Sequence, residues 1–106
     1  MASVHRRAAA RRDLIAHAAH LAENVGEGTA ERFLDKAEAT FEALAAQPTM
    51  GAPLTPRRPE LAGLRKWRID GFDNHLIFYL PRPDGVSIVR VLHAAREWES
   101  LLGVEA

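Results

Sequence analysis

The sequence predicts an α+β fold, in which an N-terminal helix hairpin packs on a small antiparallel sheet of three to four strands. The change in hydrophobic spacing along the chain leads to this fold class. Apolar residues recur at helical intervals before Pro48, whereas from Leu64 onward they alternate or run together as they do in strands. The 106 residues contain no internal repeat, so residues 1–106 are expected to form a single domain.

The first helix is predicted to start at Asp13. Its apolar positions are spaced by four, three and four residues, which traces one stripe of a helix: Leu14, Ala18, Leu21 and Val25. The segment from Asn24 to Gly28 breaks this pattern. Before the helix, Ser3–Arg7 is expected to add an edge strand, although the neighbouring arginines and alanines also suit the start of a helix.

A second helix is predicted from about Thr29 until Pro48 ends it. Its core side is expected to consist of five apolar residues: Phe33, Leu34, Ala37, Phe41 and Leu44. Its acidic side is expected to face water and consists of Glu31, Asp35, Glu38 and Glu42. Two helices joined by a short turn that contains glycine form an antiparallel hairpin, whose apolar face must be covered by another layer.

The second half of the chain supplies that layer. The proline-rich segment Pro48–Glu60 is expected to cross the surface as an extended connection. Three strands of an antiparallel meander follow, at Leu64–Ile69, Leu76–Leu80 and Val86–Leu92. The turn signals between them are Asp70–Asn74 and Pro81–Gly85. A short helix within Ala94–Leu102 is expected to return Trp98, Leu101 and Leu102 to the core.

Composition excludes several classes of function. The 14 basic residues balance 14 acidic ones, so net charge gives no argument for binding a polyanion. The absence of cysteine excludes disulfide frameworks, thiolate zinc sites and cysteine nucleophiles. The longest uncharged run, Ala43–Pro56, contains prolines and a glycine and is therefore expected to be a loop and not a membrane span. The arginine-rich start leads into no secretory signal, which favours a cytoplasmic protein.

Positive charge gathers locally in the second half of the chain. Between Arg57 and Arg68 five basic residues stand against one acid, and Trp67 alternates with two of these cations. This pattern predicts a face that binds a protein partner; direct nucleic-acid binding and simple solvation are the alternatives, and nucleic acid is the weaker of them. The predicted partner-binding residues are Arg57, Arg58, Arg65, Lys66, Trp67 and Arg68.

Two other patterns contain residue types that occur in functional sites. Asp13, His17 and His20 fall on one helical face with spacing that could hold a metal. No second-shell partner is identifiable for them, so a solvated helix face is the preferred interpretation, and neither a metal nor a cofactor is expected. Tyr79, the only tyrosine, lies among apolar strand residues and is expected to pack in the core with a partner for its hydroxyl group.

Several segments together resemble a known family. They are Ala30–Leu34, Pro48–Gly51, Leu64–Ile69, Phe72, His75–Tyr79 and Asp84–Glu97. In their order and spacing they are similar to the ParE branch of the RelE/ParE toxin superfamily. The resemblance implies the small toxin of a bacterial type II toxin–antitoxin pair, with the fold predicted above. It also implies a cognate antitoxin, ParD-like or another small protein, whose C-terminal segment wraps around the toxin.

The resemblance leaves two mechanisms open. ParE-like members are associated with inhibition of DNA gyrase, whereas RelE-like members cleave messenger RNA in the ribosome. If the chain were a nuclease, the catalytic groups would be Arg65, Arg68, His93 and Arg96. The tyrosine that such nucleases carry near the C-terminus is missing here, and His93 also suits a hydrogen bond at the end of a strand. The leading hypothesis is therefore a gyrase inhibitor that acts by binding, and the alternatives are an endoribonuclease or a diverged member without toxicity.

Overall fold

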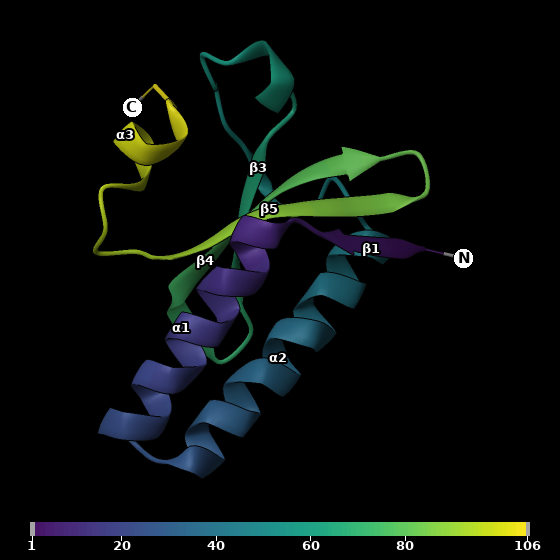
Figure 1. The fold of residues 1–106 in the computed structure, drawn as a ribbon. Helices are drawn as coiled ribbons and strands as arrows, with labels where there is room; N and C mark the ends of the chain where they lie inside the picture. The colour runs from purple at the N-terminus through teal and green to yellow at the C-terminus, as the bar shows by residue number, and fades with distance from the viewer. Residues whose placement is uncertain (1, 106) are drawn as a thin grey trace.

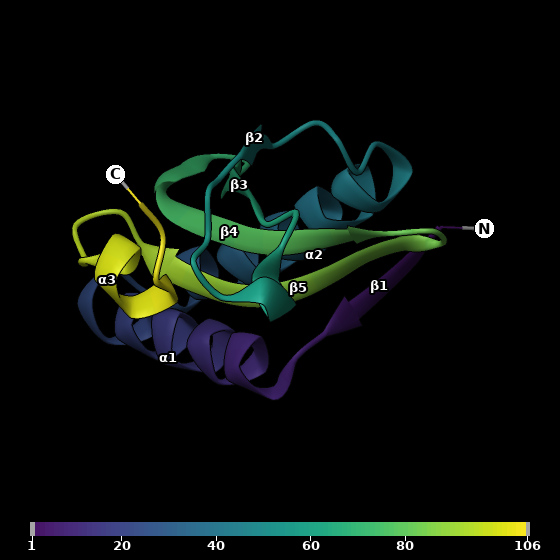
Figure 2. The same cartoon turned by 90° about the horizontal axis from the view of Figure 1, so that it is seen from above.

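The computed structural model describes residues 2–105 of the chain, arranged in three layers. In Figure 1 the helix hairpin lies below, the sheet lies in the middle, and a loop with a short 3-10 helix lies above together with the last helix. Figure 2 looks down on the sheet, with this last helix in front of the strands and the second helix behind them. The predicted α+β class, with a helix hairpin on one face of a sheet, is confirmed.

The hairpin consists of α1, Ala8–Asn24, and α2, Glu27–Ala46. Helix α1 begins five residues before the predicted start at Asp13, because the alanines that precede Asp13 are strong helix formers. The two helices are joined through Gly26, whose φ of 140° is a backbone conformation that favours glycine. The acidic side of α2 is exposed, as predicted.

The sheet has five strands in the order β1-β5-β4-β3-β2. Strands β3, Arg65–Ile69, β4, Phe72–Arg82, and β5, Gly85–His93, form the predicted antiparallel meander. Strand β1, Ser3–Arg6, confirms the predicted edge strand but pairs with β5 in parallel. The sheet is therefore mixed and not purely antiparallel, and it has one strand more than the three to four expected, because β2 was not predicted.

The connection between the helices and the sheet is less irregular than predicted. Within it, the two residues of β2, Ala52–Pro53, pair with the start of β3, and η1, Pro59–Leu61, forms one 3-10 turn. The last helix, α3, covers Trp98–Leu102. These segments fold over the face of the sheet opposite the hairpin.

Two hydrophobic clusters share the sheet, one on each face. The first lies between the hairpin and the sheet and contains Phe33, Phe41, Ile77 and Ile88 among its buried members. The second lies under the connection and α3; its buried members are Leu61, Leu64, Phe78, Leu80, Val89, Leu92, Leu102 and Val104. Central strands covered on both faces are apolar at consecutive positions, which explains the unbroken apolar runs in β4 and β5.

Two residues assigned to the apolar stripes lie outside the core. Leu34 is 40% exposed and Val25 is 66% exposed. Leu34 follows Phe33 by one residue, a turn of about 100° around the helix axis, and this rotation moves it from the sheet to the outer side of α2. Val25 lies at the end of α1, beyond the reach of the sheet.

Candidate partner-binding site

Strand β3 distributes the predicted partner-binding residues to both sides of the sheet. Alternation along a strand puts Trp67 on the same face as the buried Ile69, toward the hairpin. Lys66 and Arg68 take the other face, where the ammonium group of Lys66 lies 4.8 Å from the centre of the Trp98 ring. An aromatic side chain and two cations thus meet at one segment of backbone.

This segment lies at an open edge of the sheet. The short strand β2 pairs only with Arg65 and Lys66, so that within the described chain no strand lies outside Trp67–Ile69. An edge strand without a neighbour offers backbone N–H and C=O groups to an added chain. The segment therefore combines a backbone edge with the side chains described above.

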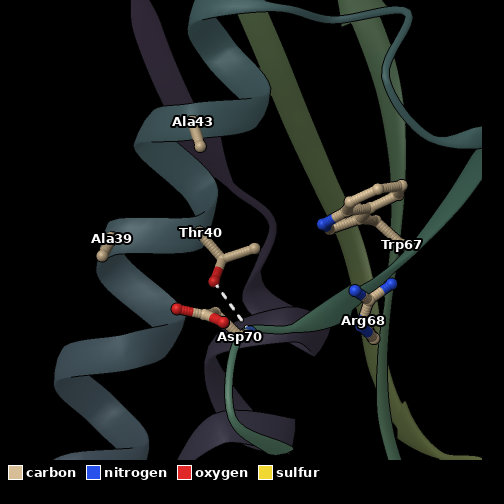
Figure 3. A pocket seen from close by; sticks show the side chains of 6 residues that line it. All are labelled: Ala39, Thr40, Ala43, Trp67, Arg68 and Asp70. Carbon is tan, nitrogen blue, oxygen red and sulfur yellow. Dashed lines mark hydrogen bonds between the residues drawn. The ribbon is translucent and has the colours of Figure 1, made fainter. Parts of the chain in front are cut away.

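A cavity of about 270 Å³ lies between α2 and the edge of β3. Figure 3 shows Ala39 and Ala43 on the helix side and Trp67 on the strand side. The hydroxyl group of Thr40 accepts a hydrogen bond from the backbone N–H of Asp70 at 3.1 Å, which ties the helix to the end of the strand (Figure 3). The two alanines leave room beside the Trp67 ring for a side chain from a partner.

A second cavity, of about 370 Å³, shares Trp67 and Arg68 with the first and extends to Met50, Ala52 and Leu76. At its rim the Nε atom of Arg68 lies 3.3 Å from a carboxylate oxygen of Asp73. The same guanidinium group lies 5.2 Å from the centre of the Trp67 ring. Both members of this ion pair are more than half exposed, so a carboxylate from a partner can compete for Arg68 at small cost.

Arg65 is committed to holding the connection between α2 and β2. Its Nη1 atom donates hydrogen bonds to the carbonyl oxygens of Thr49, at 3.1 Å, and Gly51, at 2.6 Å. The buried Tyr79 hydroxyl group donates to Pro48 O and accepts from the Gly51 N–H, both at 2.8 Å. Burial raises the pKa of Tyr79 despite the opposing effect of the Gly51 N–H. The packing role predicted for Tyr79 is confirmed.

Arg57 and Arg58 lie away from β3, beside the end of the chain. The Nε atom of Arg57 is 3.8 Å from a carboxylate oxygen of Glu105. Arg58 lines a separate cavity of about 220 Å³ together with Arg7, Arg90 and residues of α3. The six predicted partner-binding residues therefore divide into a group on β3 and a pair beside α3.

Most of the chain matches one protein family. The family profile described as "ParE toxin of type II toxin-antitoxin system, parDE" matches residues 4–98. The chain belongs to the ParE toxin family. No curated protein matches the sequence. The chain is similar in fold to a solved structure titled "Chromosomal ParDE TA system from P. aeruginosa", with a TM-score of 0.69 and 18% identity over 88% of this chain and 96% of that one.

The residues considered for a nuclease do not form one cluster of shared contacts in this ParE-family toxin. Arg65 holds the connection, and Arg68 points to the opposite face of the same strand. His93 accepts a hydrogen bond from the Ala95 N–H at 3.0 Å through its Nδ1 atom. Arg96 is exposed in the turn that follows. The pairing of β3 with β4 places Arg65 beside Tyr79, whereas His93 pairs with His75, four residues away along β4.

The face of α1 that was considered as a metal site contacts the sheet through Asp13 and His17. The Asp13 carboxylate accepts hydrogen bonds from Arg90 and from the Val91 N–H, while His17 Nε2 lies 2.8 Å from the Val91 carbonyl oxygen. The bond to Asp13 raises the pKa of Arg90. His20 contacts Asn24 one turn further along α1. Within residues 2–105 no group of three or more histidine or carboxylate side chains could hold a metal ion.

Sequence reasoning missed the helix side of the ParE toxin's candidate site. Ala39 and Ala43 carry no chemical signal, and their role depends on their position opposite Trp67. The pattern of α2 does contain one signal, because both alanines lie on the exposed side of a helix where charged residues predominate.

Among the described helices, none is long and apolar enough to cross a bilayer.

Proposed function

We propose that a cognate antitoxin, ParD-like or another small antitoxin, neutralises this toxin by docking along the outer edge of β3 and extending to Arg57 and Arg58. The observation that supports this proposal is the segment Lys66–Ile69, where a strand edge that is open from Trp67 onward, an aromatic side chain and two cations lie beside two cavities. Such an arrangement suits an extended acidic segment that folds as it binds.

Each part of this surface suits a different chemical feature of one antitoxin segment. The backbone of Trp67–Ile69 can pair with an added strand. The cavity beside Ala39, Ala43 and Trp67 accepts an apolar side chain of that strand. Carboxylates of the antitoxin replace Asp73 at Arg68 and neutralise Lys66. The cationic face thus selects an acidic segment, and the cavity fixes its register.

We further propose that the toxin acts in the cytoplasm by binding and inhibiting DNA gyrase, with no chemistry of its own. Membership of the ParE family supports this target. Action by binding and not by catalysis is supported by the hydrogen bonds of two candidate catalytic residues. Arg65 binds the Gly51 carbonyl oxygen and His93 binds the Ala95 N–H, so the two side chains share no common reaction centre.

Variants of β3 test the antitoxin site. The substitution Trp67→Ala is expected to weaken antitoxin binding by about 30-fold or more, because buried aromatic anchors typically contribute about 2 kcal/mol or more to an interface. Arg68→Glu should also weaken antitoxin binding, and its effect should be larger at low salt than at high salt, because salt screens the lost attraction. Arg82→Glu is the matched control, since Arg82 is also exposed but lies at the far end of β4. Calorimetric titration of each toxin variant with the antitoxin gives the dissociation constants, and equal losses in Arg68→Glu and Arg82→Glu would refute the site.

The target is tested with purified gyrase and purified ribosomes in parallel. The toxin is expected to inhibit supercoiling and to leave messenger RNA on ribosomes intact. Unaffected supercoiling together with cleavage of messenger RNA would overturn the proposal in favour of an endoribonuclease. Normal growth on expression without an antitoxin would instead identify a diverged, non-toxic member.

A further inference from the structure

The outer face of the helix hairpin carries apolar side chains that the fold does not use. Ile15 on α1 is 70% exposed and Leu34 on α2 is 40% exposed. Together with Leu14 they line a groove of about 300 Å³ between the two helices, which Arg11 and Glu38 also line. This groove shares no residue with the proposed antitoxin site on β3, so it is a separate surface.

The two ridges beside the groove have opposite charge. On α2, four exposed glutamates surround Leu34 on one stripe: Glu27, Glu31, Glu38 and Glu42. The exposed side of α1 begins with Arg11 and Arg12. Among the described residues Arg6 pairs with Glu38, whereas no ion pair within the chain engages Arg11, Arg12 or Glu42. A basic ridge and an acidic ridge therefore flank one apolar groove.

We propose that this face binds a second copy of the chain with two-fold symmetry. Because α1 and α2 run antiparallel, the groove brings Arg11 and Ile15 level with Glu38 and Leu34. A two-fold axis parallel to the helices keeps each residue at its level and sets α1 of one copy on α2 of the other. Ile15 then packs on Leu34 of the copy, and Arg11 faces Glu38 and Glu42, with each contact made twice.

The size of the face places this association among the small, weak interfaces. The 17 residues of α1 span about 25 Å, and two packed helices present a width of about 20 Å. The face therefore buries about 500 Å² on each copy, less than the roughly 800 Å² of a standard interface. We expect a dimer that dissociates in the micromolar range and forms at high local concentration.

Sedimentation equilibrium of the full chain from about 5 to about 500 μM, roughly two decades around a micromolar dissociation constant, tests the proposal. The substitution Ile15→Asp is expected to raise the dissociation constant at least tenfold. Val25→Asp is the matched control, because Val25 is 66% exposed but lies at the end of α1 outside the groove. A wild-type chain that stays monomeric throughout, or a dimer that Ile15→Asp and Val25→Asp affect equally, would overturn the proposal.

A charge exchange tests the relative orientation of the copies. Arg11→Glu and Glu42→Arg should each weaken self-association several-fold, because each creates two repulsive contacts in a homodimer. An equal mixture of the two variants should associate more tightly than either variant alone, since both contacts between positions 11 and 42 of the mixed dimer join opposite charges, although the glutamate introduced at position 11 still faces Glu38. A mixture that associates no better than either variant alone contradicts the geometry. Circular dichroism spectra identical to wild type establish that each variant is folded.

Discussion

Asp13 fastens the first helix to the sheet through a single carboxylate. Its side chain is only 12% exposed and accepts hydrogen bonds from both Nε and Nη2 of Arg90 and from the Val91 N–H. The substitution Asp13→Ala would leave a partly buried guanidinium group and a backbone N–H without their acceptor. We expect it to lower the free energy of unfolding by about 3 kcal/mol, measured by urea denaturation.

An exposed ion pair supplies the control for Asp13. Asp73 pairs with Arg68, and its side chain is 79% exposed. Asp73→Ala should change the free energy of unfolding by less than about 1 kcal/mol. If the two alanine variants were equally destabilised, the carboxylate of Asp13 would not have the structural role described.

His75 is enclosed by aromatic rings and by other imidazoles. The ring centres of His17 and Phe33 are each 4.9 Å from that of His75, and that of His93 is 5.2 Å away. Its Nδ1 atom is buried and has no hydrogen-bond partner within residues 2–105. Burial, and then the charges of the neighbouring histidines, lower the pKa of His75 to about 4 from its ordinary value of 6.5.

This lowered pKa predicts destabilisation by acid. The unfolded chain binds the proton first, so the stability that neutral His75 contributes is complete above pH 6.5 and is lost as the pH falls toward 4. Allowing for partial exposure, we expect a loss of about 1–2 kcal/mol between roughly pH 7 and pH 4.5. His75→Phe should abolish this part of the pH dependence in urea titrations, whereas His5→Phe, on exposed β1, should retain it. Parallel pH curves for wild type and His75→Phe would exclude the mechanism.

The charged residues of the candidate site could be predicted from sequence, but their positions could not. Trp67 and Arg68 stand out because an aromatic residue between cations is unusual in a strand. The separation of Arg65 from Arg68 follows from alternation along β3, yet the role of Arg65 depends on loop carbonyls that only the folded chain brings near it. The bond between Asp13 and Arg90 joins residues 77 positions apart, and no local sequence pattern predicts a contact of such long range.

Gly85 determines how β1 joins the sheet. Its φ is +152°, and a Cβ atom there would overlap the carbonyl oxygen of Ser3. Gly85→Ala should therefore separate β1 from β5 and lower the free energy of unfolding by about 2–4 kcal/mol. Thermal denaturation measures the loss, and hydrogen exchange should show faster exchange of the Arg7 N–H, which donates to Ile88 O.

Gly28 is the matched control for this substitution. It lies in the first turn of α2, where a Cβ atom would meet nothing within 4 Å. Gly28→Ala should leave stability unchanged or raise it by up to about 1 kcal/mol, because alanine favours helix. A Gly85→Ala variant as stable as Gly28→Ala would be incompatible with the close approach of the two strands.

The elements with strong periodicity were predictable, whereas the outer strands were only partly so. The stripes of the hairpin and the apolar runs of the meander report burial directly, so α1, α2 and β3 to β5 follow from them. The edge strand at Ser3 was expected, but its parallel pairing depends on how the hairpin crosses the sheet. The two residues of β2 contain a proline and no periodic pattern, and the bonds from Arg65 go to the carbonyl groups of Thr49 and Gly51 just before them.

At the scale of the whole molecule, the two tryptophans report on opposite faces of the sheet. Trp67 packs against the cluster under the hairpin, and Trp98 packs against the cluster under the connection. Because both clusters share β4 and β5, we expect one cooperative unfolding transition. Fluorescence of the Trp67→Phe variant, which reports Trp98 alone, and of Trp98→Phe should give the midpoints that circular dichroism gives for the same variant. Midpoints that differ between the two probes within one variant would mean that the faces unfold separately.

The pairing of β1 with β5 also orders events in time. Ser3 pairs with Gly85, so the first strand finds its place only beside residues that are translated 82 positions later. A nascent chain that has produced the hairpin has no sheet on which to pack it, and contacts of such long range form late. The sheet of this toxin is therefore completed only after Gly85 has been synthesised, and a nascent chain that ends before β5 lacks the strand beside which β1 takes its place.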